Sequence, residues 1–190
     1  MPLGPVSKPA KDHKCLGHRI IVVQNMIGKI PEKTAARRFT RHIDCVPPPG
    51  MVAYRPHRET WINPATVAAN IWDGFDERGN TLLAALDLED AYSRVRLPIL
   101  ADRMLELGIS VFWVRWVMPA LNTRRCMMKH RTWRSDWTST SIGLPQGSPL
   151  SPVLFNIYTL PLARINKPHC RLKTFADASW PVAGVNQPKT

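Results

Sequence analysis

Two aspartates follow short apolar segments and could act together in metal chemistry. Asp87 comes directly after the apolar run 81–86, and Asp177 comes two residues after the segment 171–175. If both segments are strands that end side by side, the two carboxylates could bind magnesium, which prefers oxygen ligands. Two such ions about 3.5–4 Å apart hold the attacking and the leaving oxygens of a phosphoryl displacement. Taken alone, two aspartates so far apart in the chain could equally be surface or helix-capping residues.

A segment rich in glycine and proline lies between the two aspartates and favours a role for them in metal chemistry over surface or capping roles. Residues 143–152 read GLPQGSPLSP, with two glycines and three prolines in ten residues. This composition predicts an unusual backbone path that ends at a helix beginning with Ser151-Pro152. Helix or loop statistics do not readily produce such a string, so we interpret the three segments as one functional set.

The elements that must position these segments follow from apolar spacing and from punctuation by proline and glycine. The expected helices are 63–79, 98–108, 110–119 and one starting at Ser151, and the expected strands are 81–86, a hairpin within 126–141, and 171–175. The run 81–86 is predicted to be a buried strand, although its pattern also permits a helix. Pro31 should kink or end the helix that contains it. The mixture predicts a sheet with helices packed on one face.

Composition narrows the class of partner. The chain has 190 residues, 44% of them hydrophobic, and a net charge of +12 with a pI near 10.2. Such a surplus favours a polyanion, most commonly nucleic acid, although it could also serve solubility alone. Trp133 and Trp137 could stack on bases, whereas Trp113 and Trp116 are expected in the core. The dispersed basic residues suggest a charged groove: Lys29, Lys33, Arg37, Arg38, Arg41, Arg55, Arg58, Arg124, Arg125, Lys129, Arg131 and Arg134.

The same composition predicts an intracellular protein, in the cytoplasm or nucleus and not secreted. The N-terminus has no apolar signal segment, and no apolar run approaches the roughly 20 residues of a membrane span. The four cysteines stand singly without a CxxC pair, which argues against a zinc site and fits reduced thiols.

The ordered motifs resemble a known family. GLPQGSPLSPVLFNIY strongly resembles motif B of reverse transcriptases, particularly those of non-LTR (LINE-type) retrotransposons. LDLEDAY is similar to motif A, and FADA is similar to motif C, usually aromatic-Ala-Asp-Asp. Upstream, HRIIVVQNMIGKIPEK resembles the fingers segment YRPISL…KxxEK, and AYRPHRET resembles GFRPGRST. The resemblance covers about residues 18–180 in the family's order and spacing.

The resemblance implies a two-metal catalytic site. Asp87 and Asp177 would be the catalytic metal ligands, assisted by the backbone carbonyl of Leu88. The cofactor would be two Mg²⁺ ions, with Mn²⁺ as the alternative. The family's second motif C aspartate is replaced here by Ala178, which removes one anionic oxygen group and should lower metal affinity.

It also implies substrate contacts. Tyr92 would be the steric gate that admits deoxynucleotides, or else a core aromatic. Gln146 and Gly147 would lie against the template and the incoming base pair, where a missing side chain allows close approach. Arg19 would reach the triphosphate. Arg55 and Arg58 would contact template phosphate, and each of these three arginines could instead be a solvated surface charge.

The implied fold is α+β, the fingers and palm of a right-hand polymerase with an antiparallel palm sheet and without a thumb. Residues 1–190 would be a partial reverse transcriptase domain with fingers at 15–80, palm at 81–182 and a short tail at 183–190. Only 12 residues follow Ala178 (190 minus 178), too few for motifs D and E and the thumb.

Two functions follow. One is RNA-directed DNA polymerisation, with an RNA template, a DNA primer, deoxynucleoside triphosphates and an unknown completing chain as partners. The other is a catalytically inactive retroelement fragment that only binds nucleic acid. An unstable product with an exposed palm surface is a third possibility.

Overall fold

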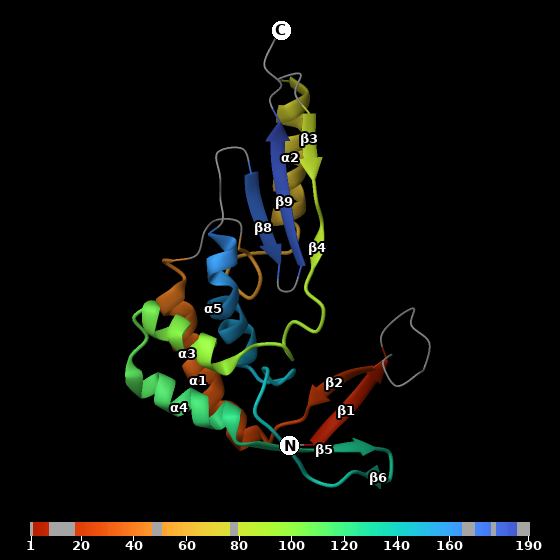
Figure 1. Cartoon of the computed structure of the whole chain (residues 1–190), viewed down its shortest axis with the longest axis vertical. Coiled ribbons are helices and arrows are strands. Elements are labelled where there is room, and N and C mark those ends of the chain that lie inside the picture. The colour runs from red at the N-terminus through yellow and green to blue at the C-terminus, as the bar shows by residue number, and fades with distance from the viewer. Residues whose placement is uncertain are drawn as a thin grey trace. The chain divides into compact units, whose positions relative to one another are not determined.

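The computed structural model describes residues 2–7, 18–46, 51–76, 80–164, 170–175 and 178–185 (Figure 1). Contacts between Cα atoms divide the chain into two compact units. One comprises Met1–Phe39 and Tyr92–Phe155, and the other comprises Thr40–Ala91 and Asn156–Thr190. The predicted fingers and palm boundaries are a different division and stay a prediction.

The first unit contains a mixed sheet in the order β2-β1-β5-β6, with β7 also paired to β5. β1 (Pro2–Ser7) is antiparallel to β2 (His18–Val22) and parallel to β5 (Arg124–His130). The hairpin expected within 126–141 is confirmed. It consists of β5 with β6 (Trp133–Arg134) and β7 (Thr138–Thr140), and Arg131 adopts a left-handed φ of 53° at the turn.

Two helices that contact each other follow motif A in the chain, α3 (Leu97–Glu106) and α4 (Val111–Asn122). Their predicted starts are confirmed, and Gly108 ends α3 with a φ of 75° that suits glycine. α4 continues through Pro119 to Asn122 rather than ending there. Trp113 and Trp116 are half-buried, and Trp113 packs edge-to-face on Phe39 at a centroid distance of 5.6 Å. The expectation that both tryptophans belong to the core is therefore correct only in part.

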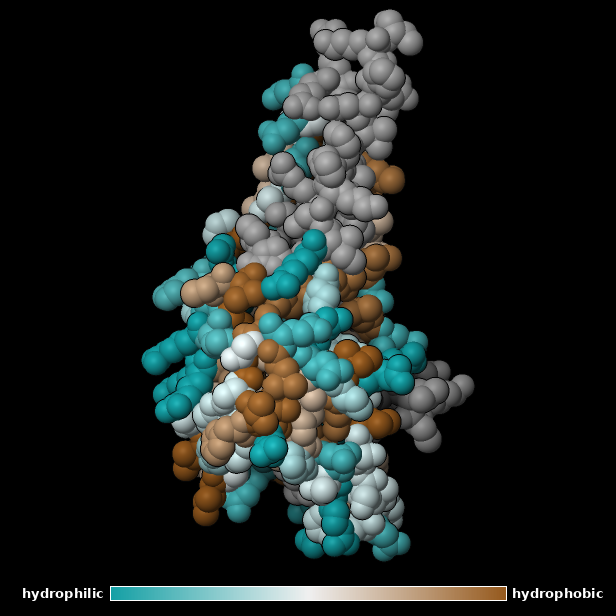
Figure 2. Space-filling view, turned by 60° about the vertical axis from the view of Figure 1, so that its left-hand side comes forward, coloured by the Kyte–Doolittle hydropathy of each residue, from teal (hydrophilic) through white to brown (hydrophobic). Residues whose placement is uncertain are grey.

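α1 (Met26–Ile43) does not end at Pro31. The helix runs on for twelve residues because its later turns bury an apolar stripe, Ala35, Ala36, Phe39 and Ile43. Burial of that stripe offsets the backbone hydrogen bond that proline cannot donate. Its first turns are different, since Met26, Ile27 and Ile30 are exposed. Figure 2 shows exposed apolar residues, in brown, among hydrophilic ones on one face of the molecule.

The second unit contains an antiparallel sheet. β9 (Ala178–Val185) pairs with β8 (Cys170–Phe175) along one edge and with β3 (Asn80–Leu83) and β4 (Leu86–Asp87) along the other. α2 (Ile62–Asp76) contacts β3 and β8. Gly74 allows this approach, because an added Cβ would clash with the Thr81 hydroxyl. An antiparallel sheet packed against a helix confirms the predicted α+β class.

One strand prediction needs correction. The run 81–86 is a strand, but it is interrupted after Leu83 and is not buried. Leu82, Leu83 and Leu86 are all exposed, with Leu82 at 64%. β3 and β4 follow one another along an edge of the sheet, and among the described strands β9 alone pairs with them, so their side chains have fewer neighbours than those of a central strand.

The remaining helix is α5 (Ser151–Ala163), which begins where Ser151-Pro152 predicts. The Ser151 hydroxyl donates to the Pro145 carbonyl at 2.8 Å. Its buried residues are Ser151, Val153, Leu154, Phe155, Asn156, Ile157 and Leu160.

Candidate active site

The motif A and motif C strands are hydrogen-bonded neighbours. Asp87 pairs with Ala178 and Leu86 pairs with Ser179 in the antiparallel register of β4 and β9. Asp87 is exposed, as is Leu88 at 37%. Asp177, the other predicted catalytic residue, lies outside the described residues. The structure thus brings Asp87 opposite the residue that is bonded to Asp177.

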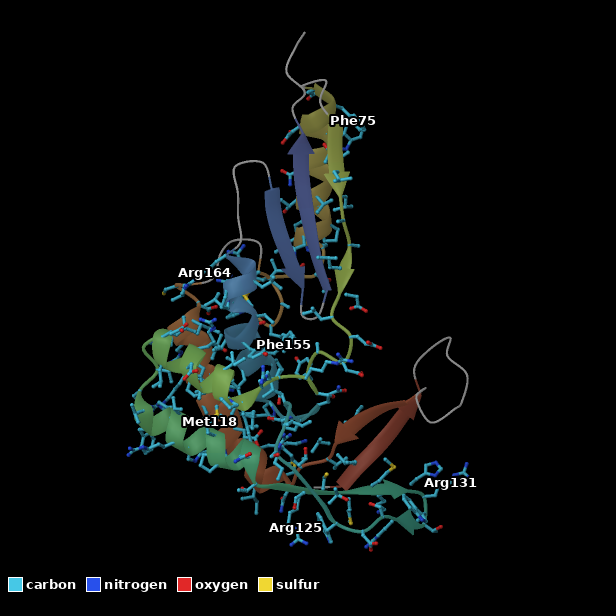
Figure 3. All side chains as sticks on the ribbon, in the orientation of Figure 1. Phe75, Met118, Arg125, Arg131, Phe155 and Arg164 are labelled. Carbon is cyan, nitrogen blue, oxygen red and sulfur yellow. The ribbon has the colours of Figure 1, made fainter. Side chains whose placement is uncertain are left out.

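Tyr92 is attached to the motif B segment. Its ring stacks on Phe155 with a centroid distance of 4.9 Å and an interplanar angle of 10°. Its carbonyl accepts a hydrogen bond from the Leu144 amide at 2.7 Å. Phe155 lies on α5, where Figure 3 labels it. The ring is half-buried, so Tyr92 is oriented by a neighbouring aromatic whether or not it meets a sugar.

The glycines of motif B are required by contacts within the chain. Gly143 has a φ of 70°, and an added Cβ would lie 2.7 Å from the Ser93 carbonyl oxygen. Gly147 has a φ of 114°, and an added Cβ would lie 2.6 Å from the Val22 carbonyl oxygen. Both φ values also disfavour any other residue. The missing side chain at 147 therefore allows close approach by β2.

Gln146 lies in the same contact. Its carbonyl accepts a hydrogen bond from the Val22 amide at 2.7 Å, and its side chain is half-buried. The end of β2 thus contacts two successive residues of the motif B loop. The Val22 amide donates to the Gln146 carbonyl, and the Val22 carbonyl lies close to Gly147. The predicted template contacts of Gln146 and Gly147 stay a prediction.

A buried arginine holds the start of this loop. Arg124 is 9% exposed, and its guanidinium donates to the carbonyls of Leu121, Ile142 and Gly143, each at 2.7 Å. Burial lowers the pKa of the Arg124 guanidinium, and the neighbouring Cys126 acts weakly in the opposite direction. Arg124 is therefore not part of the surface groove predicted from the basic residues, because its guanidinium is buried and donates hydrogen bonds to three carbonyl oxygens.

Glu32 connects α1 to the motif B loop. One of its carboxylate oxygens accepts from the Ser148 hydroxyl, and the other accepts from the Gln24 side-chain amide at 2.7 Å. The Ser148 hydroxyl also accepts from the Leu150 amide at 3.1 Å. Gln24 and Ser148 are buried. The loop 143–152 is thus held from three directions, by the 92–95 segment, by β2 and by α1.

The three predicted binding arginines differ in what the structure assigns to them. Arg19 lies on β2 opposite Val6, and its side chain is outside the described part. Arg55 donates to the Asp44 carboxylate at 3.3 Å, to the Asp44 carbonyl at 3.0 Å and to the Met51 carbonyl at 3.0 Å. Its side chain is 9% exposed, so these contacts give Arg55 a structural role. Its predicted phosphate contact stays a prediction.

Arg58 is exposed and follows a residue with unusual backbone geometry. His57 has a φ of 56°, in the left-handed region that glycine adopts easily. Residue 57 is where the resembling stretch GFRPGRST has its second glycine. The turn is attached to α5, because the buried Asn156 side chain donates to the Ala53 carbonyl at 2.8 Å.

Comparison with known proteins decides the family. The sequence matches the reverse transcriptase (RNA-dependent DNA polymerase) family over residues 7–178. The chain belongs to this family. One similar solved structure is apo telomerase from Candida tropicalis, truncated from its C-terminal domain. It matches with a TM-score of 0.60 and 12% sequence identity, and the match covers 88% of this chain and 41% of that one.

A second neighbour supports the same fold. Telomerase from Candida albicans, in complex with a TWJ fragment of telomeric RNA, matches with a TM-score of 0.66 and 10% identity. The match covers 96% of this chain and 36% of that one, so the reverse transcriptase domain described here spans less than half the length of either neighbour.

Two residues of this reverse transcriptase domain escaped sequence reasoning. Nothing in the sequence distinguishes Arg124 from the adjacent Arg125, and the two differ only in the structure, where Arg124 is buried and Arg125 is exposed. Glu32 had a signal, since it is the glutamate of the EK pair in the fingers-like segment. Among the described residues no group of three His, Cys, Asp or Glu could hold a metal, and no helix is long and apolar enough to cross a membrane.

Proposed function

We propose that this chain is the RNA-directed DNA polymerase domain of a non-LTR (LINE-type) retrotransposon. The observation that carries the proposal is the pairing of Asp87 with Ala178, which sets the motif A and motif C strands side by side. Membership in the reverse transcriptase family and the motif B string GLPQGSPLSP support it. The substrates are an RNA template, a DNA primer and deoxynucleoside triphosphates.

Asp87 and Asp177 are the proposed ligands of two Mg²⁺ ions, with the Leu88 carbonyl as a further oxygen donor. The donors fit the metal, because all are hard oxygen ligands and Asp87 is exposed. Residue 177 is bonded to Ala178, the cross-strand partner of Asp87. When bound, the ions would supply charge neutralisation at the transferred phosphate. Ala178 stands where the family's motif C has its second aspartate, so the proposed site has one carboxylate fewer and motif C is degenerate.

Tyr92 is the proposed sugar gate. A gate must resist displacement by a ribose hydroxyl, and the stacked Phe155 ring and the Leu144 hydrogen bond restrict where Tyr92 can move. Gln146 and Gly147 are proposed to face the template and incoming base pair, and their attachment to β2 makes that surface rigid. Arg19 is proposed to bind triphosphate, and Arg55 and Arg58 template phosphate.

The test is primer extension on an RNA template with deoxynucleotides, in Mg²⁺ and in Mn²⁺. The wild-type chain should extend the primer, and Asp87→Asn should abolish extension. The matched control is Asp102→Asn, which removes one exposed carboxylate from α3 and should leave extension unchanged.

Other outcomes separate the alternatives. Extension only after Ala178→Asp would locate the defect in the metal site. Binding of the primed template without extension by any folded variant would contradict the proposal and favour an inactive nucleic-acid-binding fragment.

A further inference from the structure

The hairpin of β5, β6 and β7 presents a cationic face that the proposed polymerase site does not use. Alternate residues of a strand share a face, so Arg125, Met127 and Lys129 lie on one side of β5. Arg134 is the cross-strand partner of Lys129, which puts it on that side too. Arg125, Lys129 and Arg134 are exposed. We call the surface formed by Arg125, Lys129, Arg134 and Trp137 the hairpin face.

Trp137 reaches this face through a change of register. Lys129 pairs with Arg134, whereas Cys126 pairs with Thr138, so the strand holding residues 133–140 contains one extra residue between the two pairings. Such a bulge turns the following side chains to the opposite side. Without it residue 137 would lie opposite Cys126, on the other face.

The geometry of Trp137 agrees with this placement. The Arg125 guanidinium lies 5.8 Å from the centroid of the Trp137 ring, a cation–π contact across the strands. The Trp137 side chain is nevertheless 51% exposed. An indole that is half exposed and flanked by cations is suited to stack on a nucleic-acid base.

The charge of the hairpin is strongly one-sided. Between residues 124 and 140 the exposed cations are Arg125, Lys129, Arg131 and Arg134, and the single acidic residue is Asp136. Figure 3 shows Arg125 and Arg131 on this hairpin. Arg124 contributes no surface charge, because it is buried against three carbonyls. Complementarity therefore favours a polyanion over an apolar protein segment.

We propose that the hairpin face binds single-stranded RNA, with a base stacked on Trp137 and phosphates held by Arg125, Lys129 and Arg134. The identity of the strand as template rests on the proposed function. The binding itself does not, because it needs neither a metal nor catalysis. Stacking requires an unpaired base, so the face distinguishes single strands from duplexes.

The test measures fluorescence anisotropy of a short labelled RNA of mixed sequence against the 190-residue chain, with a blunt RNA duplex as the second probe. Trp137→Ala should weaken single-strand binding about five-fold or more, the lower bound for loss of one stacked base. It should change duplex binding less than two-fold. Trp137→Phe, which keeps an aromatic ring, should restore most of the single-strand affinity.

Charge is tested separately. Arg134→Gln should weaken binding of both probes and lower the slope of log affinity against log salt for the single strand by about 0.7, the value for one lost phosphate contact. The matched controls are Trp133→Ala and Arg115→Gln on α4. Trp133 is exposed and was, like Trp137, a stacking candidate from sequence, but it pairs with His130 and so lies on the face opposite to the hairpin face. Both controls should bind like wild type.

Equal weakening by Trp137→Ala and Trp133→Ala, or by Arg134→Gln and Arg115→Gln, would overturn the proposal. So would loss of duplex and single-strand binding in the same proportion with Trp137→Ala. Asp87→Asn should bind RNA normally while failing to extend a primer, so failure of the hairpin face and failure of the polymerase function are distinguishable.

Discussion

Replacing Arg124 with methionine should destabilise the protein by about 3 kcal/mol. The substitution keeps an unbranched apolar stem but removes a guanidinium that donates to the Leu121, Ile142 and Gly143 carbonyls at 2.7 Å each. A hydrogen bond that involves a charged group contributes about 1.5–3 kcal/mol, and an acceptor left buried without a partner costs about 1–3 kcal/mol. The desolvation cost of the guanidinium, recovered in the variant, offsets part of the sum.

The assay is urea unfolding followed by circular dichroism. A loss of about 3 kcal/mol is a large share of a typical folding free energy of about 5–15 kcal/mol, so the midpoint should fall clearly while the slope m stays constant. Arg115→Met, on the exposed side of α4, is the matched control and should shift the free energy of unfolding by less than about 0.5 kcal/mol. An Arg124→Met variant as stable as that control would refute the reasoning.

Three further predictions concern backbone and metal. Gly147→Ala should lower the free energy of unfolding, measured in urea, by about 2 kcal/mol or more, because a φ of 114° is strained for alanine and its Cβ would meet the Val22 carbonyl. The control is Gly28→Ala, in open space on α1, which should be neutral or stabilising. An equal effect of the two would contradict the contact. His57→Gly should raise the free energy of unfolding by up to about 1 kcal/mol, since its left-handed φ of 56° is strained, and a loss would refute this. Ala178→Asp should tighten Mn²⁺ binding, measured by electron paramagnetic resonance of the free ion, and an unchanged affinity would argue against a metal between these strands.

Helix starts and turns were predictable from the sequence because they depend on local chemistry. Pro98 and Ser151-Pro152 mark helix starts, and Gly108 ends a helix, through constraints that act within a few residues. The resemblance to motifs A and C likewise implied a joint site, and the pairing of Asp87 with Ala178 sets the strands of these two motifs side by side.

Features decided by distant packing were not predictable. Pro31 fails to end α1 because later turns of the helix bury an apolar stripe. The run 81–86 is exposed because of its place at a sheet edge, which its apolar character does not reveal. Arg124 and Arg125 are identical in type and adjacent, yet one is buried and the other lies on the hairpin face. Successive side chains of a strand point to opposite faces, but the sequence does not show which face of β5 is buried.

The most direct test of the central claim is the rate of first-nucleotide incorporation on an RNA template under single-turnover conditions. The account predicts that the wild-type chain incorporates a deoxynucleotide, that Asp102→Asn matches it, and that Asp87→Asn is slower by about 100-fold or more, as expected for loss of a metal ligand. Equal rates for Asp87→Asn and wild type would contradict the assignment of Asp87 as the catalytic carboxylate.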